Sequence, residues 1–457
     1  NSRLSQDNHH MPPTKTDLLA SDVRHLIHPL HSKAGHQNAH VWVRSHGSTL
    51  VDADGSEYID GLSGLWNVVA GHGRTELAEA ASRQMTTLPY CSGYTGSSNL
   101  HAIALAERLA QLTYPSINRF FFTSGGGESS ETNFKTARYY FRQLGQPDKN
   151  KVISRQWGYH GVTLAAMSAT GISSYWTMFE PRVPGFLHIA SPYPYRYEAP
   201  DGISPGIAAA NELEQKILEE GPETVAMFLA EPVQGAGGVI VPPDDYFPRI
   251  REICDQYDVL LCTDEVITGF GRTGRMWGLE HWGVEPDMIQ YAKAITSGYF
   301  PLGGTGVSDK IADVLDSGEE VWMHAYTYSA HPVGCAVAMA NLDIILGEDF
   351  PTQAAEKGRT LLDGLKQRLD NHPHVGEVRG LGLMAAVEIV EDRQTKAEFD
   401  ADEKVGARIN QAMQNHGLFS RMRGDVVCLA PPIVITDQEL EQVIDAVTNA
   451  IGDVLGA

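Results

Sequence analysis

Two short stretches, VLLCTDEV at residues 259–266 and MIQYAK at residues 288–293, decide the predicted fold. Each is a run of mostly apolar residues that ends in charged side chains. Runs of this kind are typical of strands buried on both faces of a mostly parallel sheet. Four similar runs, separated by helical segments, occur at residues 118–124, 151–155, 186–190 and 225–232. The pattern predicts an α/β fold.

The stretches on either side of this region have a different texture. Between residues 11 and 70, a short helical segment precedes two alternating segments that meet at Asp54-Gly55, a pair typical of a tight hairpin turn. After residue 331, a helical stretch is followed by helices mixed with weaker strand candidates. We therefore predict a large domain at residues 71–330, with residues 11–70 and 331–457 belonging to a smaller α+β domain.

Composition excludes several classes of protein. The 457 residues include 35 Lys and Arg against 57 Asp and Glu, a net charge of −22. This balance argues against binding to nucleic acid or to an anionic membrane, since both need basic surface. No apolar run approaches the ~18 residues of a spanning helix. The five cysteines are scattered without a C-x-x-C pair, so we expect neither disulfides nor a thiolate metal site, and a cytoplasmic location.

A glycine-rich loop follows the strand candidate at residues 118–124. Gly125, Gly126 and Gly127 stand between Ser124 and a helical stretch that opens with Glu128. Backbone N–H groups at such a turn can approach an anion, and the helix N-terminus adds partial positive charge. The same residues also fit a flexible turn with an acidic first helical turn.

An acid and a lysine end the two deciding strands. Asp264 closes VLLCTD, where open α/β sheets place their ligands, although it also fits a capping residue and Glu265 is an equal candidate. Lys293 closes MIQYAK among apolar and small residues. Burial would lower the pKa of its amine and make it a nucleophile toward an aldehyde. The alternative is a lysine whose amine reaches solvent.

Two further features suit ligand binding. Tyr159 lies between glycines in Trp157-Gly158-Tyr159-His160-Gly161, so its ring could lie flat on a planar ligand, or it could be a core tyrosine beside a hydrogen-bonded histidine. Arg421, in Arg-Met-Arg-Gly-Asp, could bind a carboxylate or belong to a solvated basic loop.

Two motifs are set aside. Residues 269–274 satisfy G-x-G-x-x-G, but the stretch that follows is not an amphipathic helix, and no βαβ unit with an acid about 20 residues further on is evident. His372-Pro373-His374 lacks a third candidate ligand nearby, so we expect no metal site.

A phosphate-binding loop, an acid, an aromatic ring and a buried lysine, all at strand ends, together predict a site for pyridoxal phosphate. The acid would pair with the ring nitrogen and the lysine would bond to the aldehyde. Residues 264–274 resemble the signature of the class III aminotransferases, with residues 231–238 and Ala292-Lys293-Ala294 at that family's spacing. The resemblance extends from about residue 25 to 455.

Within that family the chain most resembles the ω-amino acid or amine:pyruvate aminotransferases. The matching segments are residues 64–67, 157–161 and 326–332, and Arg421 with Gly424-Asp425. The resemblance implies fold type I, in which a large domain with a mostly parallel seven-stranded sheet is joined by a small domain from both chain ends. It also implies a homodimer with shared active sites, which could pair into a tetramer.

The resemblance also implies roles for individual residues. Lys293 would bind the cofactor covalently and move the reaction's proton, and Asp264 would keep the ring nitrogen protonated. The remaining roles are phosphate binding by Gly126 and Gly127, ring contacts from Tyr159 and Val266, support from Glu231, and a phosphate contact from Thr327 of the neighbouring subunit. Gly127 departs from a serine common among relatives, which removes one hydroxyl contact. Substrate contacts are expected from Trp66, Leu30, Tyr94 and Arg421.

The expected reaction is transfer of an amino group from a primary amine or ω-amino acid to pyruvate, in which Arg421 would pair with the keto acid's carboxylate. Four alternatives stay open. They are a 2-oxoglutarate-dependent aminotransferase, another enzyme of the same fold (aminomutase, racemase or decarboxylase), a nucleotide-dependent oxidoreductase and a non-catalytic binding protein.

Overall fold

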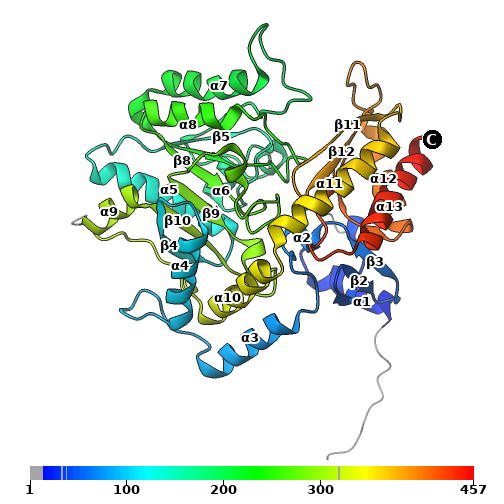
Figure 1. Cartoon of the computed structure of the whole chain (residues 1–457), viewed down its shortest axis with the longest axis horizontal. Coiled ribbons are helices and arrows are strands. Elements are labelled where there is room, and N and C mark those ends of the chain that lie inside the picture. Colours follow the sequence, from blue (N-terminus) through cyan, green and yellow to red (C-terminus); the bar gives the residue numbers. More distant parts are fainter. Residues whose placement is uncertain (1–13, 32–33, 38, 318–319, 457) are drawn as a thin grey trace, which may run out of the picture.

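A seven-stranded sheet forms the centre of the protein in a computed structural model that describes residues 14–31, 34–37, 39–317 and 320–456 (Figure 1). Across the sheet the strands are β4 (Ile117–Thr123), β10 (Gly303–Ser308), β9 (Met288–Tyr291), β8 (Leu260–Asp264), β7 (Val225–Ala230), β5 (Lys151–Arg155) and β6 (Phe186–Ile189). Strand β10 runs antiparallel to both neighbours, whereas the strands from β9 to β6 are mutually parallel. The prediction of an α/β fold with a mostly parallel seven-stranded sheet is confirmed.

Alternate residues of the central strands enter two separate cores. Phe228, Leu261 and Ile289 pack into a core with α4 (Leu100–Leu112), α7 (Pro205–Glu220) and α8 (Tyr246–Gln256). Met227 and Leu260 face the other way, into a core with α5 (Gly126–Gln143), α6 (Leu164–Ala169) and α9 (Asp309–Ser317). Both sheet faces are therefore covered by helices, which explains why the strands are apolar at every position.

Strand β10 was not predicted, because its sequence GGTGVS contains no apolar run. Its glycines are required by close packing. A Cβ on Gly304 would lie 2.5 Å from the Tyr291 hydroxyl oxygen, and one on Gly303 would lie 3.0 Å from the Tyr291 carbonyl oxygen. The glycines of β10 are needed because the neighbouring strands leave no room for side chains there. The sequence of β10 alone does not reveal this.

Two smaller sheets lie beside the large one (Figure 1, right). One has the order β1 (Trp42–His46), β2 (Thr49–Asp52), β3 (Glu57–Asp60) and β13 (Leu418–Phe419), and the other β11 (Val375–Gly380), β12 (Ala385–Ile389), β15 (Val426–Leu429) and β14 (Arg421–Arg423). The hairpin predicted at Asp54-Gly55 is confirmed by the antiparallel pairing of β2 with β3. The parallel pairing of β3 with β13 joins the two ends of the chain in one sheet.

The other helices complete the two regions. They are α1 (Lys15–His25), α2 (Ser63–Trp66), α3 (Thr75–Thr87), α10 (Pro332–Gly347), α11 (Phe350–Leu369), α12 (Val405–Asn415) and α13 (Asp437–Leu455). Helix α10 packs against α3 and α4, while α11 and α12 pack against α13. The domain boundaries at residues 70 and 330 stay a prediction. None of the described helices is both long and apolar enough to cross a membrane.

The glycine motif at residues 269–274 has a structural role, because its Arg272 connects three segments of the chain. The buried Arg272 donates through Nη1 to the carbonyl oxygens of Pro431 (2.7 Å) and Leu383 (3.2 Å), and through Nη2 to Ser63 Oγ (2.9 Å). Positive φ angles at Phe270, Gly271 and Gly274 shape the loop that carries it. One guanidinium thus ties the large sheet to segments from both chain ends.

Candidate active site

A cavity of about 410 Å³ opens where β8, β9 and β5 end and α5 begins. Its position at the carboxyl ends of parallel strands is where open α/β sheets bind ligands. The predicted site residues that line it are Gly126, Gly127, Tyr159, Glu231, Asp264, Val266 and Lys293. Segments far apart in the sequence therefore meet around one cavity.

Lys293 is the second residue after the end of β9 and the first of the short helix η5 (Lys293–Thr296). Its φ of +48° is a left-handed conformation, which costs a non-glycine residue roughly 1–2 kcal/mol. Burial lowers the pKa of its amine from 10.5 to about 8, and the positive charge of Arg421 acts in the same direction. Asp264 and Glu231 oppose this shift. An amine with this pKa is partly neutral at physiological pH, as a nucleophile must be.

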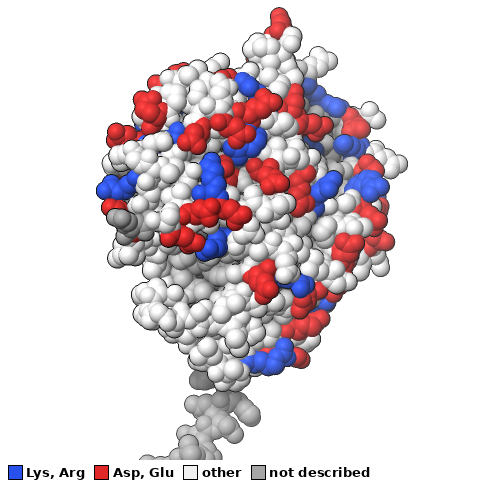
Figure 2. All heavy atoms as spheres, turned by 60° about the vertical axis from the view of Figure 1, so that its left-hand side comes forward, with Lys and Arg blue, Asp and Glu red and all other residues white. Residues whose placement is uncertain are grey.

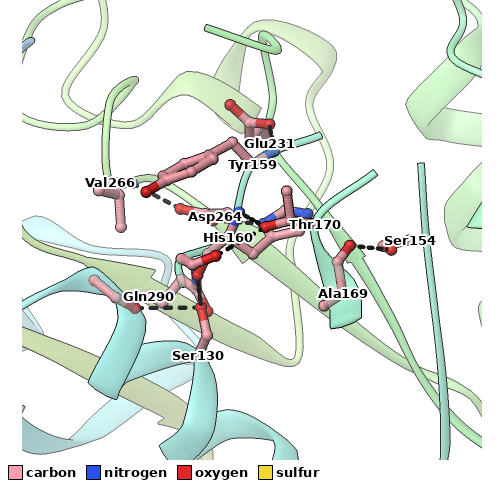
Figure 3. A network of polar contacts seen from close by, with 12 residues as sticks. Ser130, Ser154, Tyr159, His160, Ala169, Thr170, Glu231, Asp264, Val266 and Gln290 are labelled. Carbon is pink, nitrogen blue, oxygen red and sulfur yellow. Dashed lines mark hydrogen bonds and ion pairs between the residues drawn. The ribbon is translucent and has the colours of Figure 1, made fainter. Parts of the chain in front are cut away.

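Asp264 is buried at the tip of β8 and held on both carboxylate oxygens. Oδ2 lies 2.7 Å from His160 Nδ1, and Oδ1 accepts a hydrogen bond from the Val266 N–H at 3.1 Å (Figure 3). The His160 backbone is fixed in turn, because its N–H donates to Thr170 Oγ1 and its carbonyl accepts from Ser130 Oγ. The carboxylate is therefore oriented by a network that reaches β5, α5 and α6.

Glu265, the equal candidate from sequence, is not among the residues that line the cavity. Its carboxylate accepts hydrogen bonds from the N–H groups of Gly278 (2.8 Å) and Leu279 (3.0 Å), and from the hydroxyls of Thr268 and Tyr114. Burial raises its pKa to about 7, while these donors oppose the shift. Glu265 thus anchors a turn behind the sheet, and of the two acids only Asp264 faces the cavity.

Glu231 supports the loop that carries Tyr159. Its Oε1 accepts from the Tyr159 N–H (2.9 Å) and its Oε2 from the Gly235 N–H (3.0 Å). Burial and the nearby Asp264 raise its pKa. Figure 3 shows Tyr159, Val266 and Asp264 around the same space. A planar ring between Tyr159 and Val266 would have one edge toward Asp264.

The glycine-rich loop forms one wall of the cavity, where α5 begins at Gly126. The first N–H groups of a helix have no partner within the helix, and the helix dipole favours an anion there. A Cβ on Gly126 would meet Val266 Cγ2 at 3.1 Å, so the absence of a side chain keeps this approach open. Glu128 does not compete with an anion, because its carboxylate accepts from the Ser124 N–H at 2.8 Å. The residues present fit the phosphate group, aldehyde and ring nitrogen of pyridoxal phosphate.

Several predicted residues lie outside the described lining of this cavity: Thr327, Trp66, Arg421, Leu30 and Tyr94. Trp66 is buried against Val233 and Ile267, and its neighbour Asn67 lines the cavity instead. Leu30 and Tyr94 are 70% and 59% exposed. Thr327 is exposed, and its carbonyl accepts from the Tyr90 hydroxyl. Arg421, at the start of β14, is near enough for its charge to influence the pKa values of Lys293 and Tyr159.

His160 is a cavity residue for which the sequence predicted no role. Its position directly after Tyr159, beyond a buried strand, could have indicated a functional role. A histidine at this position is also compatible with a purely structural role in the core. Other unpredicted residues of the cavity wall are small or apolar: Ser124, Gly161, Val162, Thr163, Ile267, Phe300, Pro301 and Leu302. They carry no chemical signature in the sequence.

Fold and cavity together define an enzyme that uses pyridoxal phosphate, and comparison with known proteins gives its family. The family model "Aminotransferase class-III" matches residues 31–451. The chain belongs to the class III aminotransferases and is a pyridoxal-phosphate-dependent aminotransferase.

Relatives cover nearly the whole chain. A thermostable (S)-enantioselective ω-transaminase from Thermomicrobium roseum is 47% identical, with a TM-score of 0.94 over 97% of this chain and 100% of that one. The ω-transaminase from Pseudomonas jessenii, solved with PMP, is 39% identical over 96% and 98% of the two chains, with a TM-score of 0.92. The putrescine–pyruvate aminotransferase of Pseudomonas aeruginosa is 40% identical over 96% of this chain and 93% of its own length.

Proposed function

We propose that this aminotransferase moves the amino group of a primary amine or ω-amino acid to pyruvate. The observation that carries the proposal is the cavity in which Lys293 faces the same space as Asp264, with the charge of Arg421 close to Lys293. A guanidinium there suits the carboxylate of a small keto acid. The similarity to a putrescine–pyruvate aminotransferase and to ω-transaminases supports the same choice.

Each group has a task in this reaction. Bound pyridoxal phosphate supplies an aldehyde that takes up the amino group and a ring that withdraws electrons from the substrate carbon. Lys293 Nζ holds the cofactor between turnovers and moves the proton that leaves the donor's carbon. Asp264 favours a proton on the ring nitrogen, which increases the electron withdrawal. Tyr159 and Val266 hold the ring from its two faces, and Glu231 holds the Tyr159 loop.

The first helical turn of α5 takes the phosphate through the backbone N–H groups of Gly126 and Gly127. No side-chain hydroxyl is present at Gly127, so the backbone carries more of the contact. For the substrate, Trp66, Leu30 and Tyr94 surround the donor's side group, with Arg421 as the clamp for the acceptor. None of these three side chains lines the described cavity, so each reaches that position only if a second subunit or a movement of its segment brings it there.

We also propose a homodimer with shared active sites. Large apolar side chains are exposed on α4 and on the segments around residues 85–94 and 321–328: Met85, Tyr90, Tyr94, Leu100, Ile103, Val321, Met323 and Tyr328. In the space-filling view a broad area without charged side chains lies below a region of mixed charge (Figure 2). Such apolar surface is typical of an interface. Thr327, in the segment of residues 321–328, then adds its hydroxyl to the phosphate site of the partner subunit.

A second acceptor, 2-oxoglutarate, also needs a test, because the diaminobutyrate–2-oxoglutarate transaminase of Halomonas elongata is 40% identical over 90% of both chains.

We place the enzyme in the cytoplasm, since all five cysteines are free and four are buried. Free thiols are usual in a reducing compartment.

The test separates the two half-reactions. The holoenzyme is mixed with an amine alone (putrescine, β-alanine or an aryl-alkyl amine), and the visible spectrum should change to that of the pyridoxamine form. Adding pyruvate should restore the starting spectrum faster than adding 2-oxoglutarate. An aminomutase, racemase or decarboxylase would release no stoichiometric aldehyde or ketone from the amine. Faster return with 2-oxoglutarate would refute the pyruvate assignment.

A further inference from the structure

A cluster of histidine and carboxylate side chains lies outside the cavity, near the N-terminus. Asp22 is in the last turn of α1, His28 follows that helix, and His36 ends the short helix η1 (Ala34–His36). Asp22 Oδ2 lies 2.8 Å from His28 Nε2 and 3.4 Å from His36 Nε2. One ligand atom from each residue falls within 4.8 Å of the others. No part of the proposed reaction uses these groups.

The contact between Asp22 and His28 is short, but it is not a hydrogen bond. Asp22 Oδ2 and His28 Nε2 are both buried, and neither has a hydrogen-bond partner among the described residues. Buried polar atoms are nearly always paired, and an exception calls for an explanation such as an ion that binds between them. Asp22 Oδ2 and His28 Nε2 are close together but poorly aligned for a hydrogen bond. Both atoms can instead direct a lone pair at an ion bound beside them.

The two imidazole rings lie against each other beside the Asp22 carboxylate. The rings of His28 and His36 are stacked with centroids 3.4 Å apart and 17° between their planes. Neutral imidazoles beside a carboxylate form the donor set that Zn²⁺ and neighbouring divalent transition metals prefer.

We propose that Asp22, His28 and His36 bind a divalent transition-metal ion, with Zn²⁺ as the ion that suits them best. Tetrahedral Zn²⁺ with bonds of about 2.0–2.1 Å places neighbouring ligand atoms roughly 3.3–3.4 Å apart. The separations of 2.8 and 3.4 Å need only a small adjustment to reach this value. The fourth position would be open to water. This assignment revises the expectation from sequence that the chain has no metal site.

Metal binding would hold His28 and His36 to Asp22 of α1. Leu30 lies in the sequence between two of the ligands, and it is the residue assigned by resemblance to the substrate pocket. The start of α1 is already tied to the β2–β3 hairpin, because Lys15 Nζ lies 2.5 Å from Asp54 Oδ2. The ion would therefore tie the segment that carries Leu30, a residue expected to contact substrate, to helix α1.

The experiment measures metal binding directly. The metal-free holoenzyme is titrated with Zn²⁺ by calorimetry, and with Cu²⁺ followed by electron paramagnetic resonance, to which the cofactor is silent. We expect one saturable site per chain and hyperfine splitting from two imidazole nitrogens. Single changes Asp22→Asn, His28→Gln and His36→Gln should each weaken Zn²⁺ binding by roughly tenfold or more.

Two controls make the outcome decisive. His25→Gln changes a histidine in the same helix turn that is not part of the cluster, and it should bind Zn²⁺ as the unchanged protein does. His9→Gln with His10→Gln removes a histidine pair in the sequence that could bind metal by itself. The proposal is overturned if no saturable binding occurs, if the three ligand variants bind unchanged, or if binding disappears with His9 and His10.

Discussion

His160 Nδ1 lies 2.7 Å from Asp264 Oδ2, and both side chains are buried. His160 Nε2 has no hydrogen-bond partner among the described residues, so Asp264 is the polar contact of this ring. The imidazole therefore acts on the cavity through the carboxylate. Because the hydrogen bond of its ring goes to Asp264, we treat it as a positioning residue.

Replacing His160 with leucine should slow the donor half-reaction. Losing one partner of a buried hydrogen bond costs about 1–3 kcal/mol, which corresponds to roughly 5- to 150-fold in rate if the loss falls on the transition state. Stopped-flow spectroscopy measures the rate constant of this half-reaction, and its pH profile should shift relative to the unchanged enzyme. His281→Gln is the matched control, since His281 contacts the Thr273 carbonyl and should leave that profile unchanged. An unchanged profile in His160→Leu would contradict a positioning role.

The neighbouring acids Asp264 and Glu265 should give opposite phenotypes. Asp264→Asn should abolish most turnover while the unfolding temperature changes little, because the ring nitrogen loses its anionic partner. Glu265→Gln should keep the chemistry and lower stability, since the new amide cannot accept from all the donors that Glu265 holds, at about 1–3 kcal/mol for each buried group left unpaired. Calorimetry and half-reaction rates on the two variants measure both properties. The reverse pattern would assign the cofactor contact to Glu265.

Lys293 should give cofactor binding a characteristic pH dependence. Its pKa of about 8, below the ordinary 10.5, means that the reactive neutral amine becomes the major form as pH rises through 8. The rate at which apoenzyme incorporates pyridoxal phosphate covalently should therefore rise to a plateau just above pH 8. Incorporation is measured by borohydride trapping, with Lys293→Ala as the blank. A rate that keeps rising beyond pH 10 would indicate an unperturbed lysine.

The two glycines of the phosphate loop should respond differently to serine. A Cβ on Gly127 would have only ordinary contacts, at 3.9 Å from Thr163 Cγ2 and 4.0 Å from Gly161 Cα, whereas one on Gly126 would lie 3.1 Å from Val266. Gly127→Ser should retain cofactor more tightly, because it adds a hydroxyl donor to the phosphate. Gly126→Ser should retain it less. The rate of cofactor loss on dialysis measures both, and a Gly127→Ser enzyme that loses cofactor faster would place the phosphate elsewhere.

Arg421→Ala should lower kcat/KM for pyruvate more than for an amine without a carboxylate. A charge-assisted hydrogen bond worth about 1.5–3 kcal/mol is lost only for the keto acid, or roughly 10- to 100-fold. Arg423→Ala is the comparison on the same strand. Its guanidinium lies 3.8 Å from the centre of the Trp157 ring, so its loss should disturb the Tyr159 loop and slow both half-reactions alike. Equal losses for both substrates in Arg421→Ala would argue against the clamp.

The sequence predicted the parts of the site whose chemistry needs a particular residue type. Asp264 and Lys293 are conspicuous as charged residues at the ends of apolar strands, and the glycines before α5 are conspicuous as a group. Strand β10 could not be predicted, since its glycines reflect the bulk of Tyr291 on the adjacent strand. The choice between Asp264 and Glu265 required resemblance, because adjacent strand residues point to opposite faces and the sequence does not say which face holds the cavity.

Other features depend on contacts across the fold. The pairing of His160 with Asp264 joins residues more than a hundred positions apart, and each alone fits a core residue. The cluster of Asp22, His28 and His36 was missed because its spacing follows no regular helix or strand. The residue type of Arg421 indicates a contact with an anion. Its distance from the cavity, however, depends on how β14 pairs with β15, which the sequence does not show.

The parallel pairing of β3 with β13 has a consequence for biosynthesis. A ribosome releases Ile59 long before it makes Leu418, so the strand waits with an unpaired edge while the large sheet can already assemble. Exposed strand edges are prone to pair with other chains. Enzyme synthesised at high rates, or cut short near its end, should therefore aggregate through β3, and slower translation should improve the yield of native protein.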